Sequence, residues 1–167
     1  MMRIVAIIQA RMGSTRLPGK ALEKIAGMTM LERVVRRTAA SRLISEVTVA
    51  TTVSPHDDLI SDASSGIGCR CFRGSEQDVL DRYLRAAVEF EAEIVVRITS
   101  DCPLIDAVVV DRVITAFLDE APDYASNTLE RTYPRGLDTE VLSRAALDRA
   151  WREADQPYQR EHVTPFI

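Results

Sequence analysis

Four short apolar or β-branched segments alternate along the chain with amphipathic helical patterns. The strand-like segments are 3–9, 46–52, 69–73 and 93–99, each bounded by polar or turn residues. The helical patterns are 30–40, 55–64, 75–90 and 106–118. Strands that alternate with helices form βαβ units, whose parallel strands are covered by helices on both faces. The order therefore predicts an α/β fold, a three-layer α/β/α sandwich with a mainly parallel, Rossmann-like sheet.

The pattern weakens after Pro122. Short extended pieces are expected at 124–128, 132–138 and 139–142, with a turn at 134–136 and a helix over 143–154. A chain of 167 residues is long enough for one domain with a substantial core. We find no internal repeat and no linker, so one domain over 1–167 is expected.

Composition and charge exclude several classes of protein. The formal net charge of -4 disfavours general nucleic-acid binding, which uses a broad basic face. No apolar run approaches the roughly 20 residues that span a bilayer, and no signal peptide is visible, so a cytoplasmic protein without membrane partners is expected. Cys69, Cys71 and Cys102 are odd in number, which indicates a reducing compartment. The spacing of Cys69 and Cys71 predicts two sulfurs packed on one face of a strand rather than a zinc site.

A basic loop follows the first strand-like segment. Residues 9–20 read Gln-Ala-Arg-Met-Gly-Ser-Thr-Arg-Leu-Pro-Gly-Lys, and the first acidic residue of the chain is Glu23. Ligands of such sheets gather at the carboxyl ends of the strands, where this loop should lie. A concentration of positive charge in an acidic chain predicts an anionic ligand, and a polyphosphate is the first to consider.

The spacing in this loop excludes two common phosphate motifs. A Walker A loop needs four residues between its glycines and a hydroxyl residue after the lysine, but five residues separate Gly13 from Gly19, and Ala21 follows Lys20. Gly13 has no partners for a dinucleotide fingerprint either. Backbone amides at 12–15 can face phosphate oxygens, with Arg11 and Arg16 as bidentate ligands and Lys20 as a point charge. The alternative is a solvated basic loop held by surface acids.

The loop resembles the signature loop of cytidylyltransferases that activate acidic sugars, in particular the SpsF-type family of spore coat polysaccharide biosynthesis proteins. The resemblance continues in order through 72–83, 97–106, 126–138 and 161–165. It implies a nucleotide-diphospho-sugar transferase fold and a magnesium-dependent enzyme that makes a CMP-sugar and pyrophosphate from CTP and an acidic sugar. It also implies catalytic roles for Arg11, Arg16, Lys20 and Asp101, and nucleotide contacts from Gln9, Ala10, Arg11, Gly13, Ser14, Arg16, Lys20 and Arg82.

Carboxylates suggest where a divalent cation would bind. Asp101 directly follows the strand 93–99, and Mg²⁺ favours carboxylate oxygens beside a triphosphate. In the resembling family the aspartate at this place binds the metal, so Asp101 is the expected Mg²⁺ ligand; Ser100 stands where the family commonly has glycine. Asp106 is either a second carboxylate or the N-cap of the following helix, and the second reading is favoured. Arg82 is either a nucleotide contact or a surface arginine paired with Asp78 or Asp81.

The later blocks suggest contacts with the second substrate. Asp138 and Arg135 are candidates for the acceptor side, although Asp138 also suits a turn before a strand. Glu161 and His162 are read as structural or acceptor-contact residues. Family members run on well past the block at 161–165, so the resemblance implies a chain truncated at its C-terminus, and it makes a homodimer plausible. A glycosyltransferase that uses a ready-made nucleotide sugar, or a non-catalytic nucleotide-binding protein, stays open, as does UTP in place of CTP.

Overall fold

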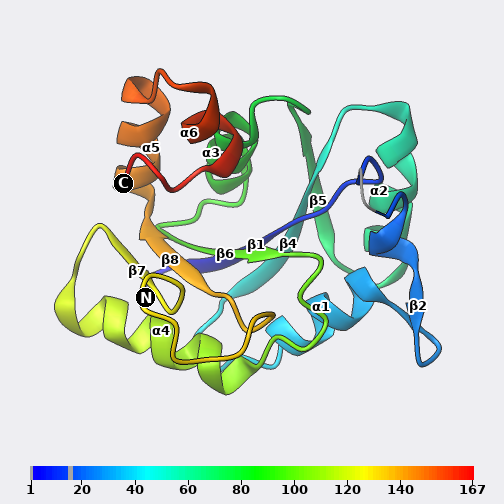
Figure 1. Cartoon of the computed structure of the whole chain (residues 1–167), viewed down its shortest axis with the longest axis horizontal. Coiled ribbons are helices and arrows are strands. Elements are labelled where there is room, and N and C mark those ends of the chain that lie inside the picture. Colours follow the sequence, from blue (N-terminus) through cyan, green and yellow to red (C-terminus); the bar gives the residue numbers. More distant parts are fainter. Residues whose placement is uncertain (1, 15–16) are drawn as a thin grey trace.

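A mixed sheet forms the centre of the molecule. The computed structural model describes residues 2–14 and 17–167. Over these residues six strands lie in the order β5-β4-β1-β6-β8-β7 (Figure 1). The first four are parallel, whereas β8 runs antiparallel to both β6 and β7. Their bounds are β1 Ile4–Gln9, β4 Glu46–Thr52, β5 Arg70–Gly74, β6 Ile94–Thr99, β7 Tyr124–Ser126 and β8 Glu140–Ser143.

Helices cover both faces of this sheet. One layer holds α1 (Met30–Thr38), α2 (Asp58–Gly66) and α4 (Ala107–Glu120), and the other holds α3 (Val79–Glu89), α5 (Arg144–Glu153) and α6 (Pro157–His162). Figure 1 shows α3, α5 and α6 across the sheet from α1 and α4. Alternate residues of β1 enter the two cores, so Ile4, Ala6 and Ile8 face one layer and Val5 and Ile7 the other. The predicted three-layer α/β/α sandwich is confirmed.

Several local features differ from the sequence prediction. Helix α3 begins at Val79, not near Ser75, because the Asp78 side chain accepts a hydrogen bond from the Asp81 amide and is the N-cap. The extended piece expected at 132–138 is irregular, with a turn at Gly136 (φ 96°). The short hairpin of β2 (Lys24–Ile25) and β3 (Met28–Thr29) and the helix α6 were not predicted. Short 3₁₀ turns occupy Lys20–Leu22 and Pro55–Asp57.

The cysteines are packed as expected. Cys69, Cys71 and Cys102 are free thiols that pack in or against the core cluster between the sheet and the layer of α1, α2 and α4. Burial, with the nearby Cys71 and Glu46, raises the pKa of Cys69 to about 12. In the described part of the chain, no helix combines the length and apolar character needed to cross a membrane.

Asp106 caps helix α4, which confirms the alternative that the sequence favoured. Its carboxylate accepts hydrogen bonds from the amides of Val108 at 2.9 Å and Val109 at 3.2 Å. Asp106→Ala removes this acceptor and should lower the free energy of unfolding by about 1 kcal/mol, as measured by urea denaturation. Asp106→Asn keeps an oxygen in place and is expected to stay within about 0.5 kcal/mol of the unmodified chain. Equal losses in both variants would contradict the capping role.

Candidate active site

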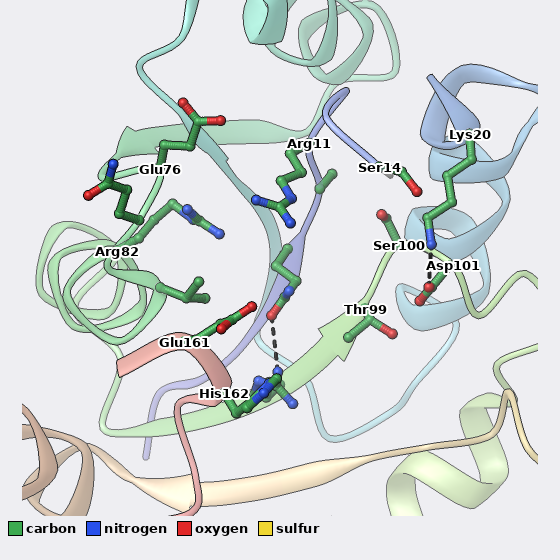
Figure 2. A pocket seen from close by; sticks show the side chains of 15 residues that line it. Arg11, Ser14, Lys20, Glu76, Arg82, Thr99, Ser100, Asp101, Glu161 and His162 are labelled. Atoms are coloured by element: carbon green, nitrogen blue, oxygen red, sulfur yellow. Dashed lines mark hydrogen bonds and ion pairs between the residues drawn. The ribbon is translucent and has the colours of Figure 1, made fainter. Parts of the chain in front are cut away.

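A polar cleft opens at the carboxyl ends of β1 and β6. Its volume is about 850 Å³. The basic loop lines one side, the start of α3 another, and the end of α6 a third (Figure 2). The lining side chains are mostly charged or polar, and comprise Gln9, Ala10, Arg11, Ser14, Lys20, Glu76, Gln77, Val79, Arg82, Arg97, Thr99, Ser100, Asp101, Glu161 and His162. Residues from positions 9 to 162 therefore meet in one cleft, as ligand sites of open α/β sheets do.

The backbone of the basic loop turns around Met12. The carbonyl oxygen of Met12 accepts hydrogen bonds from the amides of Ser14 at 2.9 Å and Gly19 at 3.0 Å. Gly19 has a φ of 74°, a conformation that favours glycine. A Cβ atom at Gly13 would meet nothing within 4 Å, so internal packing does not require this glycine. Arg16, with its predicted catalytic and nucleotide roles, lies outside the described residues.

Lys20 and Asp101 form an ion pair at the edge of the cleft. Lys20 Nζ lies 2.6 Å from Asp101 Oδ2 (Figure 2). Burial opposes ionisation of Asp101, but hydrogen bonds from Lys20 and Thr99 outweigh it and hold the pKa of Asp101 below its ordinary value. The Asp101 carboxylate is therefore ionised near neutral pH, and both side chains of the pair lie where a ligand that enters the cleft would meet them.

Arg82 is a buried cation rather than a surface residue. Its side chain is 2% exposed, and its guanidinium donates to the carbonyl of Ser75, while Nε has no partner among the described residues. The prediction of a surface arginine paired with Asp78 or Asp81 is wrong. Asp78 binds Arg160 instead, and Asp81 binds Arg85. Burial lowers the pKa of Arg82, and repulsion from the positive charge of Arg11 lowers it further.

Arg97 is a lining residue that the sequence analysis missed. Its guanidinium pairs with Glu140, donates to Gln9 Oε1 at 3.2 Å, and lies 5.7 Å from the centre of the Tyr83 ring. Glu140 also accepts hydrogen bonds from Tyr124 at 2.8 Å and Thr164 at 2.7 Å. The signal in the sequence was a lone charged residue within the otherwise β-branched strand Ile94–Thr99.

Glu161 and His162 reach the cleft from the end of α6. Arg160 holds this helix in place, because its guanidinium binds Asp78 at 2.5 and 3.0 Å and the carbonyl of Trp151 at 2.6 Å. In Figure 2 the two side chains lie away from Lys20. The acceptor-side candidates are thus divided between two places: Arg135 is exposed and Asp138 pairs with Arg131 at 2.9 Å, and neither lines the cleft.

The cleft offers few side chains that could bind a metal ion. Among residues 2–14 and 17–167, no group of three or more His, Cys, Asp or Glu side chains is placed to hold one. Asp101 is the carboxylate beside the basic loop. A single carboxylate fits Mg²⁺, which usually takes its other ligands from phosphates and water. It does not fit a structural zinc site.

The chain is similar to known proteins in both sequence and structure. A family model described as cytidylyltransferase matches residues 5–167. The spore coat polysaccharide biosynthesis protein SpsF of Bacillus subtilis is 35% identical over 98% of the chain and 69% of its own length. The 3-deoxy-manno-octulosonate cytidylyltransferase of Geobacter sulfurreducens is 44% identical over 77% of the chain. The solved structure of a cytidylyltransferase from Leptospira borgpetersenii superposes with a TM-score of 0.94 at 37% identity, covering 99% of this chain and 71% of that one.

The chain spans only part of these relatives. It matches about two thirds of SpsF, and the aligned region is 50% of the Geobacter enzyme. The activities of the full-length relatives are therefore only proposed for this chain.

Proposed function

The chain belongs to the cytidylyltransferase family, and we propose that it transfers the cytidylyl group of CTP to an acidic sugar, giving a CMP-sugar and pyrophosphate for polysaccharide biosynthesis. One observation carries this proposal: Arg11, Lys20, Arg82 and Arg97 meet in one cleft with Asp101, on a chain that matches the family over residues 5–167. A cleft rich in cations suits a triphosphate, because arginine binds phosphate oxygens in a fork and lysine adds a compact charge.

The reaction in this proposal is an in-line displacement. A hydroxyl oxygen of the sugar attacks the α-phosphorus of CTP and releases its proton to solvent, the bond from that phosphorus to the bridging oxygen breaks, and pyrophosphate leaves. Arg11, Arg16 and Lys20 would stabilise the charge that grows on the leaving group. Such transfers depend on positioning and charge neutralisation more than on a protein base, so the proposal assigns no general base.

Asp101 would hold Mg²⁺ in this site. When bound, the ion neutralises phosphate charge and helps to orient the displacement. Asp101 suits this role because its pKa is low and its carboxylate faces the cleft beside Lys20. Lys20 would keep the carboxylate ionised before the nucleotide binds.

The acceptor would enter on the side of α6. Glu161 and His162 line that side, and one relative acts, by its name, on 3-deoxy-manno-octulosonate, an acidic sugar. The arginines and the lysine of the lining would also suit the carboxylate of such a sugar. Arg135 and Asp138 lie outside the lining, so a contact with the acceptor would require a change in the 127–138 segment. A homodimer stays a prediction.

The test is a product analysis with four nucleoside triphosphates and a panel of sugar acids that includes 3-deoxy-manno-octulosonate, in the presence of Mg²⁺. Phosphorus NMR should show pyrophosphate and a new phosphodiester, with CTP preferred over UTP. Transfer of sugar from a nucleotide sugar, without pyrophosphate, would support the glycosyltransferase alternative instead. Binding of no nucleotide at millimolar concentration would contradict the proposal.

A further inference from the structure

We propose that Asp57 is a positioning residue of the nucleotide site, which fixes the basic loop in the conformation that binds the triphosphate. The inference rests on the proposed function, because it concerns the affinity for CTP. Asp57 ends the short 3₁₀ turn Pro55–Asp57 that follows β4, and it does not line the cleft. It would therefore act through the loop rather than by contact with the nucleotide.

Asp57 is a buried carboxylate attached to the loop. Asp57 is only 3% exposed, and its Oδ1 accepts a hydrogen bond from the Met12 amide at 2.7 Å. Oδ2 accepts from the hydroxyl of Thr52, whose own oxygen accepts from the Ser54 amide at 3.1 Å. Both carboxylate oxygens are thus engaged, and they join the loop to the end of β4. Burying a charged group is costly unless it is hydrogen-bonded, so these contacts are strong constraints on the position of Met12.

Met12 extends this constraint to Ser14 and Gly19. Its amide is held by Asp57, and its carbonyl accepts from the amides of Ser14 and Gly19. Arg11 precedes Met12 and Lys20 follows Gly19, so the two cations flank the points that Met12 holds. A loop that has already adopted its bound conformation loses less entropy when a ligand binds. Removing Asp57 should therefore weaken triphosphate binding without removing any ligand contact.

The charge of Asp57 also acts on the neighbouring cations. Arg82 is buried near Arg11, and the negative charge of Asp57 opposes the repulsion between them. The geometry and the charge can be separated by substitution. Asp57→Asn keeps an oxygen for the Met12 amide and offers an N–H to the Thr52 oxygen, but removes the charge, whereas Asp57→Ala removes both hydrogen bonds.

A control exists in helix α4. The Asp111 carboxylate of α4 accepts hydrogen bonds from the Ser41 hydroxyl at 2.5 Å and from the Arg42 amide at 3.2 Å. Like Asp57, it therefore binds one backbone amide and one hydroxyl. It does not line the cleft. Asp111→Ala measures what the loss of such an anchor does to the fold in general.

The test is calorimetric titration of the full chain with CTP and Mg²⁺, together with thermal unfolding. Asp57→Ala should weaken CTP binding by about tenfold or more, Thr52→Val by about threefold, and Asp57→Asn by less than about threefold. Asp111→Ala should leave affinity unchanged although its melting temperature falls. Thr52→Val keeps the volume of the buried side chain, so it supplies the answer if Asp57→Ala does not fold.

Two failures can be told apart in this experiment. If the unmodified chain binds no nucleotide, the proposed function fails. If it binds CTP, and Thr52→Val and Asp57→Ala bind CTP as well as Asp111→Ala does, the role of Asp57 is overturned. A large loss in Asp57→Asn, equal to that in Asp57→Ala, would also overturn it, because the hydrogen bonds would then not be the cause.

Discussion

Replacing Lys20 with alanine is expected to lower CTP-dependent turnover by about 100- to 1,000-fold, the range seen when one preorganised charge-stabilising donor is removed. Lys20 Nζ faces the cleft and lies 2.6 Å from Asp101. In the proposed reaction its charge balances the developing pyrophosphate, so the loss should fall on the rate of transfer. The ion pair is partly exposed and should contribute less than about 1 kcal/mol to folding, so the melting temperature should change little. Pyrophosphate release, measured alongside thermal unfolding, checks both expectations.

The control for this substitution is the other lysine of the chain. Lys20 and Lys24 are the only lysines in the sequence, and Lys24 is exposed in the hairpin strand Lys24–Ile25. Lys24→Ala should keep full turnover, because its charge lies outside the cleft lining. Lys20→Arg keeps the positive charge but replaces the compact ammonium with a planar guanidinium, so we expect its turnover to lie between those of the unmodified chain and Lys20→Ala. Intact turnover in Lys20→Ala would show that the phosphate role is wrong.

Replacing Glu140 with alanine should be the most destabilising of the changes considered, at about 3–5 kcal/mol, because it leaves a buried arginine without its counter-charge. Arg97 and Glu140 are each only 13% exposed at the side chain. The substitution also removes the acceptor for the hydroxyls of Tyr124 and Thr164. A chain of this length should lose about 10 °C in melting temperature for such a change.

A second ion pair supplies the comparison for Glu140. Arg149 and Asp123 lie 2.8 Å apart, but their side chains are 46% and 55% exposed. Asp123→Ala should therefore cost less than about 1 kcal/mol. Urea denaturation of the two variants measures the difference directly. If Glu140→Ala were no less stable than Asp123→Ala, the buried network around Arg97 would not stabilise the fold.

The sheet was predictable because three of its parallel strands, β1, β4 and β6, are mostly buried on both faces. Such strands are mostly apolar or β-branched, and the predicted bounds 46–52 are those of β4 (Glu46–Thr52). Helix α6 was missed because none of its residues is buried, so it has no apolar stripe to detect. It is held instead by Arg160, which binds Asp78, a residue 82 positions away in sequence. Tertiary contacts of this kind leave no local signal.

The lining of the cleft was predictable where its residues lie in the loops after β1 and β6. Lys20 and Asp101 were chosen separately, each beyond a different strand, and the structure pairs them. Arg97 was missed because it lies within a strand, where a charge is explained only by its partners Glu140 and Gln9. Asp57 looked like part of a helix start, since its partner Met12 is 45 positions away. Arg135 and Asp138 followed from the resemblance alone, and they lie outside the cleft.

Competition between CTP and an amine-selective reagent tests most directly whether this cleft is the nucleotide site. Lys20 and Lys24 give separate modified peptides in mass spectrometry, so one acts as the probe and the other as the internal control. With Mg²⁺ present, CTP should slow the acetylation of Lys20 several-fold and leave that of Lys24 unchanged, and ATP or GTP should protect less. Equal acetylation of Lys20 with and without saturating CTP would contradict the assignment of this cleft.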